Sequence, residues 1–248
     1  MKKRIFVNIH YLEIGGAERA LLGLLAALNP NKVNVDLFVN QHTGEFMPLV
    51  PDWVNLLPEI PEYTCIERPI KQIVKEGHIG IAVRRLLAKW KHSKYQQSLI
   101  DVNRKHDASI FQYVANGVDG GLPSLYKYGE YDLAIGFVNP HNITLNKVKA
   151  KKKICWIHTD YSTIHINHDL ELPIWDGFDY IASISEDCTK AFVKTFPELE
   201  HKIVLIENIL SPLFVRQQAE LDDVSAEMPD EFGVVKILTI GRFSPPKK

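Results

Sequence analysis

Short runs of apolar residues alternate along the chain with longer stretches in which apolar residues recur every three or four positions. Seven short runs predict β-strands, and several are rich in Val and Ile and apolar on both faces, as strands packed between helical layers are. Four longer stretches predict amphipathic helices. The predicted strands are Arg4–Ile9, Val33–Asn40, Tyr131–Val138, Lys153–His158, Tyr180–Ser185, Ile203–Glu207 and Val234–Ile240, and the predicted helices are Ala17–Leu28, Ile79–Lys105, Glu186–Thr195 and Pro212–Leu221.

This alternation predicts an α/β fold with a Rossmann-like, doubly wound and mainly parallel sheet that carries helices on both faces. The stretch from Thr43 to Glu62 holds four prolines and predicts irregular or edge structure. Residues 217–233 are polar and acidic, which is typical of a linker. We therefore expect a first domain over residues 1–210, a linker with a helix over 211–233, and the first strand and turn of a second domain over 234–248.

The composition is that of an ordinary soluble protein, with 46% hydrophobic and 24% charged residues. The formal net charge of −1 provides no overall attraction to nucleic acid, so we expect no nucleic-acid partner. Three widely spaced cysteines argue against a disulfide framework and against a Cys-x-x-Cys metal site. The chemistry of this protein must therefore come from local groups of residues.

The N-terminus places three basic residues before a short apolar run that is interrupted at Asn8 and His10. This run is too short for the apolar region of a signal peptide, so we interpret it as the first strand. No stretch approaches the roughly 20 apolar residues of a membrane span. We expect a cytoplasmic protein.

The first predicted strand leads into Gly15 and Gly16, and the helix that follows carries Glu18 and Arg19 in its first turn. Glycines let the backbone approach a ligand closely, and a helix N-terminus presents free N–H groups to an anion. A simple tight turn is the alternative. The chain lacks both G-x-G-x-x-G and G-x-x-x-x-G-K-[ST], and the second strand ends at Asn40 without a ribose-binding acid. These absences argue against a dehydrogenase and a P-loop ATPase.

His158 ends a strand that we expect near the centre of the sheet, where the carboxyl ends of strands form the binding crevice. A hydrogen-bonded structural histidine is the alternative. Asp160, His165, His168 and Asp169 follow closely, but their spacing matches no zinc signature such as H-E-x-x-H. We therefore predict solvated or capping roles for these four residues and no metal.

Ser183 and Ser185 lead from a strand into a helix that begins with two acids, which is typical of helix N-cap chemistry. The hydrolase motif G-x-S-x-G is absent. At the end of the chain, Arg242 and Lys247 flank a rigid Ser-Pro-Pro turn. Two cations on one turn suit a diphosphate, since Arg can bind two oxygens and Lys adds a point charge. A solvated basic turn is the alternative.

Together and in this order, these motifs resemble those of the family 4 glycosyltransferases, retaining enzymes of GT-B architecture that transfer a sugar from a nucleotide-sugar to an acceptor. The resemblance covers nearly the whole chain, although residues 43–129 contribute little to it. Its elements are a GGAER-type loop at Gly15–Arg19, a strand-end histidine at Trp156–Thr159, an SxxVSE-type step at Ile181–Glu186, a VIxNxID-type segment at Leu205–Leu210 and a GRLSPEKG-type turn at Gly241–Lys248.

The resemblance implies an acceptor-side domain followed by the start of a truncated donor domain, which binds a UDP- or GDP-sugar without a metal or other cofactor. The acceptor is then a glycan or a lipid-linked molecule of cell-surface polysaccharide synthesis, and the truncated chain alone is inactive. In the intact enzyme the cations stabilise the leaving diphosphate, and the histidine orients the transferred sugar. The implied catalytic residues are His158, Arg242 and Lys247, and the implied substrate-binding residues are Gly15, Gly16, Glu18, Arg19 and Ser185.

The chain departs from the family pattern in two places: the usual Asp is absent after Asn208, where Ile209 and Leu210 stand, and Lys248 replaces the usual Gly. Two other function classes stay open. One is a binding module that presents the acceptor to a separately encoded donor subunit. The other is a different Rossmann-type enzyme that uses the cluster of His and Asp residues after His158 with a metal.

Residues 81–105 combine basic and apolar character. Between Arg84 and Lys105 the segment carries seven Lys and Arg residues against the single acid Asp101, together with apolar residues that include Leu86 and Trp90. A basic amphipathic helix with Trp suits an anionic membrane surface, which predicts a peripheral contact with the inner face of the membrane. The alternative is a helix whose apolar stripe packs on the core while its basic face is solvated.

Overall fold

The computed structural model describes the chain except for residues 1, 100–105, 211, 221–222, 224–231 and 238–248. The chain divides into two units, residues 1–209 and residues 210–248. The described part of the second unit contains one helix, α9 (Pro212–Ala219), and residues 234–237 form no strand. The rest of the strand and turn expected over 234–248, with Arg242 and Lys247, lies outside the described residues.

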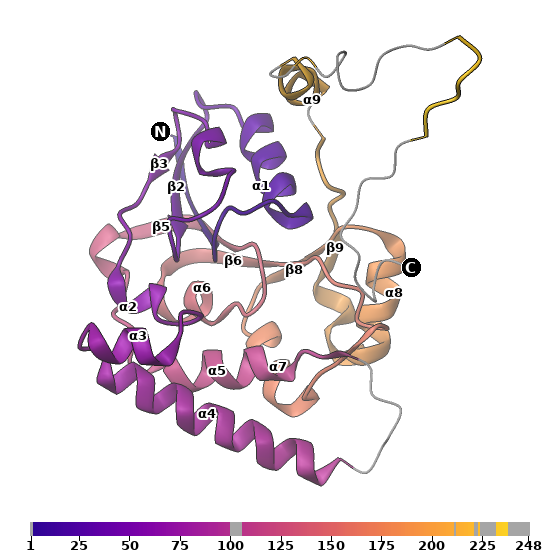
Figure 1. The fold of residues 1–248 in the computed structure, drawn as a ribbon. Helices are drawn as coiled ribbons and strands as arrows, with labels where there is room; N and C mark the ends of the chain where they lie inside the picture. The colour runs from indigo at the N-terminus through magenta and orange to yellow at the C-terminus, as the bar shows by residue number, and fades with distance from the viewer. Residues whose placement is uncertain (1, 100–105, 211, 221–222, 224–231, 238–248) are drawn as a thin grey trace. The chain divides into compact units, whose positions relative to one another are not determined.

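The first unit is built on a seven-stranded sheet in the order β3-β2-β1-β5-β6-β8-β9, and every neighbouring pair is parallel (Figure 1). A separate parallel pair joins two short strands, β4 and β7. Parallel strands need crossover connections, and most connections here contain a helix. The strands are β1 (Lys3–Ile9), β2 (Val33–Val39), β3 (Asn55–Leu56), β4 (His106–Asp107), β5 (Glu130–Gly136), β6 (Lys149–Ile157), β7 (Ile164–His165), β8 (Tyr180–Ser183) and β9 (Ile203–Leu205).

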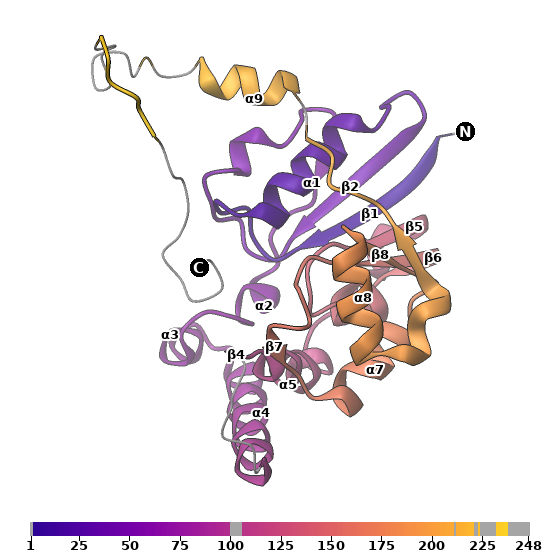
Figure 2. The ribbon, with the colours of Figure 1, turned by 90° about the vertical axis from the view of Figure 1, so that its right-hand side faces the viewer.

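Helices lie on both faces of the sheet, and Figure 2 shows α1 on one side of the strands and α7 and α8 on the other. The α-helices of this unit are α1 (Gly16–Ala27), α2 (Pro61–Thr64), α3 (Ile70–Lys75), α4 (Ile79–Ser98), α5 (Ser109–Asp119), α6 (Asn142–Lys147), α7 (His168–Asp176) and α8 (Glu186–Thr195). Short 3-10 helices span η1 (Met47–Leu49), η2 (Tyr126–Tyr128) and η3 (Pro197–Lys202).

The alternation of side chains along β1 creates the two faces. Ile5, Val7 and Ile9 point to one side and pack against α1, whereas Phe6 points to the other side. There the Phe6 ring meets the ring of Tyr131 with centroids 5.3 Å apart. Both faces of β1 are therefore buried, as its run of apolar residues predicts.

On the second face, α4 and α5 pack closely together, and Figure 1 shows them lying below the sheet. Gly117 of α5 permits this approach, because a Cβ atom at that position would lie 2.8 Å from the Cβ of Ala88 in α4. The close contact fixes which side of α4 faces the protein. Its buried residues are Ile81, Ala82, Arg85, Ala88 and His92.

The predicted fold class is confirmed: the sheet is parallel, Rossmann-like and covered by helices on both faces. Helix α8 has the predicted bounds, and six of the predicted strands are present with shifted ends. Strands β3, β4 and β7 were missed, since each has only two residues. Among the six, the largest shift is that of β6, which starts at Lys149 because the lysine-rich segment before Ile154 also pairs with β5.

Other predictions need correction. The long helix predicted to reach Lys105 ends at Ser98, and residues 100–105 lie outside the described residues. The proline-rich stretch 43–62 is not wholly irregular, since it contains η1, β3 and the start of α2. Helices α5, α6 and α7 were not expected from the sequence. Two of them are short, and α7 contains Pro173, which weakens a helical pattern.

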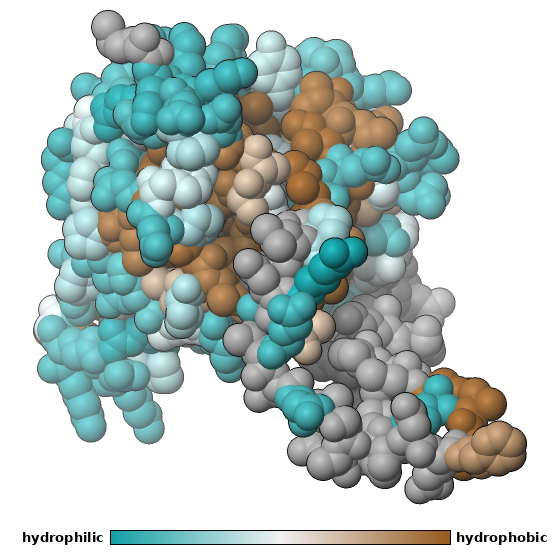
Figure 3. Space-filling view, turned by 90° about the horizontal axis from the view of Figure 1, so that it is seen from above, coloured by the Kyte–Doolittle hydropathy of each residue, from teal (hydrophilic) through white to brown (hydrophobic). Residues whose placement is uncertain are grey.

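None of the helices in the described part of the chain combines the length and apolar character that a membrane span needs. Figure 3 views the molecule from the side away from α4, where hydrophilic residues cover much of the periphery and hydrophobic ones lie between them. Large apolar side chains are exposed along the first three turns of α4: Ile79, Val83, Leu86, Leu87 and Trp90.

Candidate functional site

The candidate site lies at the carboxyl edge of the sheet. Strands β1, β5, β6 and β8 are consecutive parallel neighbours, so the segments that follow them open at one edge. In open α/β sheets this edge holds the ligand. The Gly15 turn follows β1, and His158 follows β6 directly. The fold therefore brings both predicted motifs to one side of the molecule.

Gly15 is the N-cap of α1 and has an extended backbone, with φ −157° and ψ 162°. The space beside the Cα of Gly15 is occupied by the Glu18 carboxyl group, since a Cβ atom at Gly15 would lie 2.0 Å from Oε2 of Glu18. At Gly16 a Cβ atom would meet nothing within 4 Å. The first N–H groups of a helix lack partners within the helix. Open space at Gly16 thus leaves room for an anionic group at the start of α1.

Glu18 and Arg19 are both half-buried in the first turn of α1. The backbone N–H of Arg19 donates to the carbonyl of Gly15 at 3.1 Å, the first hydrogen bond of the helix. The contact of the Glu18 carboxyl group with Gly15 shows that this side chain folds back over the turn. A negative charge at a helix N-terminus is stabilised by the helix dipole, and it would compete with an anionic ligand for the same place.

His158 packs on Phe137, and the two ring centroids lie 4.7 Å apart. Its Nε2 atom is buried without a hydrogen-bond partner among the described residues. Burial lowers the pKa of His158 to about 4, so the imidazole is neutral at physiological pH. A neutral imidazole with an unused ring nitrogen can donate to, or accept from, a hydroxyl group of a ligand.

A second histidine, His141, lies deeper behind the same edge. It is fully buried and meets Trp175 edge-on, with ring centroids 4.8 Å apart. Burial, with smaller effects of His10 and His158, lowers its pKa to about 3. His141 is therefore a neutral core residue under ordinary conditions.

Ser185 caps helix α8. Its Oγ accepts a hydrogen bond from the backbone N–H of Cys188 at 3.2 Å, and its carbonyl accepts one from the Ser183 hydroxyl at 3.0 Å. These contacts are those of helix-start chemistry. The side chain of Ser185 lies half-buried at the carboxyl end of β8, and a hydroxyl group can donate as well as accept a hydrogen bond.

The polar residues after His158 do not gather around a common point. His165 contacts the hydroxyl of Tyr95 at 3.2 Å, whereas His168 lies against Asp169 and the ring of Phe196. Among the residues that the structure describes, no three His, Cys, Asp or Glu side chains are placed to share a metal ion.

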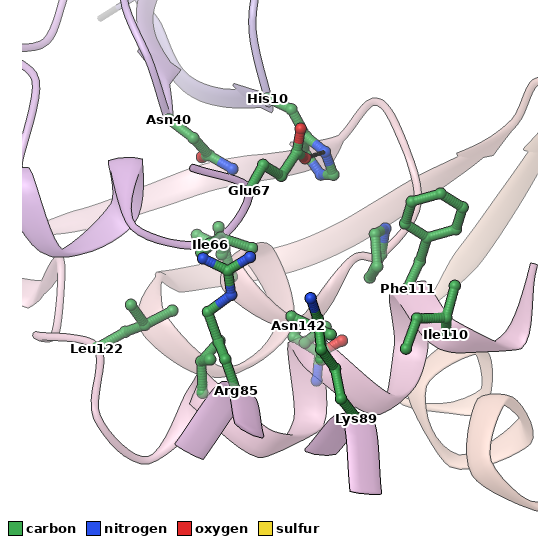
Figure 4. A pocket seen from close by; sticks show the side chains of 15 residues that line it. His10, Asn40, Ile66, Glu67, Arg85, Lys89, Ile110, Phe111, Leu122 and Asn142 are labelled. Carbon is green, nitrogen blue, oxygen red and sulfur yellow. Dashed lines mark hydrogen bonds and ion pairs between the residues drawn. The ribbon is translucent and has the colours of Figure 1, made fainter. Parts of the chain in front are cut away.

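A pocket of about 330 Å³ opens beside this edge (Figure 4). His10 and Asn40, the first residues after β1 and β2, form its upper rim, and the buried faces of α4 and α5 form its lower walls. Most of its lining is apolar. The lining residues are His10, Asn40, Ile66, Glu67, Arg85, Lys89, Ile110, Phe111, Val114, Ala115, Val118, Leu122, Pro140, Asn142 and Ile143.

Charged groups converge on one part of this pocket. Nδ1 of His10 lies 3.0 Å from Oε1 of Glu67 and donates to it when the carboxyl is ionised. Burial raises the pKa of Glu67, but the hydrogen bond and charge of His10 and the charge of Arg85 outweigh burial and lower it overall. Glu67 is therefore a carboxylate that is already satisfied by its neighbours.

Arg85 is 6% exposed and reaches up from α4 toward Ile66, with Glu67 above it (Figure 4). One of its terminal nitrogens donates to the carbonyl of Cys65 at 2.8 Å and also to that of Arg68. Its Nε has no partner among the described residues. Burial lowers the pKa of Arg85, yet a guanidinium stays charged in proteins. A buried positive group with an unused donor thus faces the pocket.

The structure brings Gly15, Gly16, Glu18, Arg19, His158 and Ser185 to the carboxyl edge of the sheet. It adds residues that the motifs did not identify, namely His10, Glu67, Arg85 and Lys89. Position alone could have indicated His10 and Asn40, because each directly follows a predicted strand. Nothing in the sequence links Glu67 and Arg85 to this edge, since they come from a loop and a helix that lie between strands.

The amino-acid sequence matches no protein-family model and no curated protein. A solved structure similar to this chain is that of HepE from Anabaena in complex with UDP-glucose, with 13% sequence identity and a TM-score of 0.44. The match covers 88% of this chain and 50% of that chain. The chain therefore spans about half the length of that protein.

Proposed function

We propose that residues 1–209 form the acceptor-side domain of a retaining glycosyltransferase. The substrates are a nucleotide-sugar, such as a UDP- or GDP-sugar, and a glycan or lipid-linked acceptor of cell-surface polysaccharide synthesis. One observation carries the proposal: three features lie at the same edge of a parallel sheet. They are a glycine turn at a helix N-terminus, a neutral histidine whose Nε2 has no partner among the described residues, and an open pocket. The order of these motifs along the chain, with its resemblance to family 4 glycosyltransferases, gives the reaction class.

In the proposed reaction, the bond between the anomeric carbon and the diphosphate oxygen breaks, and a bond forms between that carbon and the acceptor hydroxyl oxygen. The hydroxyl proton passes to the departing diphosphate, and the products are a glycoside and a nucleoside diphosphate. No oxidant, reductant or cofactor is consumed. Catalysis then depends on holding donor and acceptor together and on stabilising the negative charge of the leaving group.

The proposed roles follow from the chemistry of each group. The first backbone N–H groups of α1, which starts at Gly16 beside open space, bind the phosphates, and neutral His158 hydrogen-bonds a hydroxyl of the transferred sugar. Arg19 and Ser185 contribute further polar contacts to the substrates. Arg242 and Lys247, which lie outside the described residues, stabilise the diphosphate.

The test is an assay of a protein that continues this chain through a complete second domain, with a panel of UDP- and GDP-sugars. We expect His158→Ala to lower kcat at least a hundredfold while the melting temperature changes little, and His158→Gln to recover part of the activity. Product anomers followed by NMR should show retention. The proposal is wrong if the wild-type protein consumes no nucleotide-sugar, or if His158→Ala is fully active.

We also propose that α4 rests on an anionic membrane surface during the reaction. The helix contains five Lys and Arg residues and no acid. Its outward stripe is apolar, with Leu87 and Trp90 each 54% exposed, and Nζ of Lys94 lies 4.0 Å from the centre of the Trp90 indole. A second, smaller apolar stripe with Ile81, Ala82 and Ala88 packs on the core, as in the alternative reading, and the larger stripe stays exposed.

The charges of α4 suit an anionic membrane surface. Arg84, Lys91 and Lys94 are exposed, and their positions along the helix flank the apolar stripe. Large apolar side chains bordered by cations match the boundary between acyl chains and anionic headgroups. A protein that covered α4 would need an apolar groove bordered by acidic residues. An anionic bilayer binds any helix that combines apolar and basic residues in this way.

A further inference from the structure

We infer that the pocket of Figure 4, which opens beside the carboxyl edge of the sheet and has α4 and α5 as its lower walls, binds a phosphate-headed amphiphile. The aliphatic chain lies on the apolar wall, and the phosphate lies between Arg85 and Lys89. The inference rests on the proposed function only in taking this amphiphile as the acceptor or its carrier, since its binding requires no sugar transfer. The ligand class follows from the walls of the pocket, considered one by one.

The apolar wall is large enough for a chain. Ile110, Val114 and Val118 recur along one face of α5, and Leu122 and Ile143 complete the surface. The volume of about 330 Å³ lies at the lower end of the range for small-molecule sites, roughly 300–1,000 Å³. Such a wall offers a sugar ring few hydrogen bonds, because a sugar presents hydroxyl groups on every side. An alkyl chain, in contrast, is removed from water when it lies against this wall.

The polar end selects an anion. Arg85 and Lys89 are four residues apart on α4, so their side chains project from the same helix face, and both line the pocket. Figure 4 shows both rising from α4 toward the rim formed by His10 and Glu67. Glu67 lines the same pocket as a carboxylate, and its charge interacts with that of Arg85. The two cations outnumber this one acid, so the α4 end of the pocket keeps a net positive charge.

A phosphate monoester fits this end better than a carboxylate. It carries a charge of about −1.5 to −2 at neutral pH and three strong acceptor oxygens, so one group can meet both cations. The Nε of Arg85, which has no partner among the described residues, and the exposed ammonium of Lys89 are donors of the kind that bind phosphate oxygens. Asn142 also lines the pocket, and its amide is held in place because Oδ1 accepts from Gln112 and one N–H donates to Asn116.

The position of the pocket agrees with this use. Arg85 and Lys89 lie on the same helix as the outward apolar stripe, so a lipid that leaves a bilayer beneath α4 meets the pocket wall within one turn of helix. His10 belongs to the segment that leads to Gly15 and Gly16. An amphiphile held here therefore presents its headgroup toward the carboxyl edge of the sheet.

The experiment is a titration of the 248-residue chain with octyl phosphate, octanol and inorganic phosphate, followed by calorimetry and by amide NMR shifts. We expect saturable binding of octyl phosphate, at least tenfold weaker binding of octanol, and no measurable binding of inorganic phosphate at the same concentrations. Butyl, hexyl and octyl phosphates should gain roughly fourfold in affinity per methylene, the value for burial of a CH₂ group.

Three variants assign the site. Lys89→Ala should weaken octyl phosphate about tenfold and leave octanol unchanged, because it removes only a charge-assisted contact. Val114→Phe, which fills the apolar part, should weaken both ligands. Lys190→Ala is the control, since Lys190 is an exposed lysine on α8 and does not line the pocket. Its affinities should equal those of the wild type.

Each remaining outcome overturns the inference. Absence of saturable octyl phosphate binding removes the site, and equal binding of octanol removes the role of the cations. Equal effects of Lys89→Ala and Lys190→Ala place the headgroup elsewhere. Tight binding of inorganic phosphate alone identifies a free-phosphate site instead of an amphiphile site. None of these results decides whether the extended enzyme transfers sugar, so failure of this inference is distinct from failure of the proposed function.

Discussion

The imidazole of His158 lies against the phenyl ring of Phe137, with the ring centroids 4.7 Å apart and the planes inclined at 44°. The two residues directly follow parallel neighbouring strands, β6 and β5, so the sheet itself sets their spacing. Phe137 is buried, and burial is the cause that lowers the pKa of His158 to about 4. The neutral state of this candidate catalytic histidine therefore depends on an apolar neighbour.

Replacing this neighbour should raise the pKa of the histidine. In Phe137→Leu a smaller side chain covers the imidazole less completely, so water reaches it and the charged form becomes less costly. We expect the pKa of His158 to move from about 4 toward 6.5, its ordinary value, at a cost in stability of about 1 kcal/mol. An NMR titration of the imidazole protons measures the change. An unchanged value would show that Phe137 does not control the hydration of His158.

Two glycines of α1 should respond oppositely to alanine. At Gly23 a Cβ atom would lie 1.9 Å from the backbone carbonyl oxygen of Ile209, a group that cannot easily move, so Gly23→Ala should destabilise the domain by about 1–3 kcal/mol. At Gly16 no atom lies within 4 Å, and alanine favours the helix, so Gly16→Ala should keep or slightly raise stability.

Chemical denaturation of both variants checks this pair. In the extended enzyme we further expect Gly16→Ala to reduce turnover at least tenfold, because the new methyl group occupies the space proposed for a phosphate. If Gly16→Ala lowers stability as much as Gly23→Ala does, the first glycine has a structural role. If the extended Gly16→Ala enzyme is fully active, no ligand approaches the start of α1.

Glu171 should make the domain less stable as the pH rises. Burial raises the pKa of this carboxyl from 4.5 to about 7, although Trp175 and Tyr161 both donate to its Oε2 at 3.2 Å. The folded chain keeps a proton that the unfolded chain releases above pH 4.5. The stabilising contribution is therefore complete below pH 4.5 and is lost by about pH 7, a change on the order of 3 kcal/mol.

The variant Glu171→Gln removes the ionisation and keeps an oxygen for both donors. We expect it to match the wild type near pH 4.5 and to exceed its free energy of unfolding at pH 8, as measured by urea denaturation across this range. Glu200→Gln, a change at an exposed carboxyl on η3, serves as the control. Parallel pH profiles for the wild type and Glu171→Gln would rule out this role.

The membrane contact of α4 can be measured by flotation with liposomes. Leu87→Glu places a charge on the apolar stripe and should reduce binding to anionic vesicles more than tenfold, because burial of a leucine contributes about 1.5–3 kcal/mol. Leu205→Glu is the matched control, since Leu205 is 51% exposed and lies on β9. Neutral vesicles should bind weakly in all cases. Equal losses in the two variants, or no binding of the wild type at low salt, would contradict a docked α4.

The sequence by itself determined six of the seven strands of the large sheet and the edge at which the chemistry gathers. The consecutive apolar residues Ile5, Phe6 and Val7 are typical of a strand that is buried on both faces. Once strands and helices alternate, the sheet is parallel and its carboxyl ends share one edge. The Gly15 turn and His158 therefore had to lie on the same side, and they do.

Only the tertiary structure decided the pocket and the orientation of α4. Periodicity offers two apolar stripes on this helix, and the larger side chains, Leu87 and Trp90, would favour burial of their own stripe. The protein buries the smaller one, because Gly117 of α5 admits Ala88 at close range and the carbonyls of Cys65 and Arg68 bind Arg85. These partners lie 17 to 29 residues from their contacts on α4, and no local pattern specifies a contact at that separation.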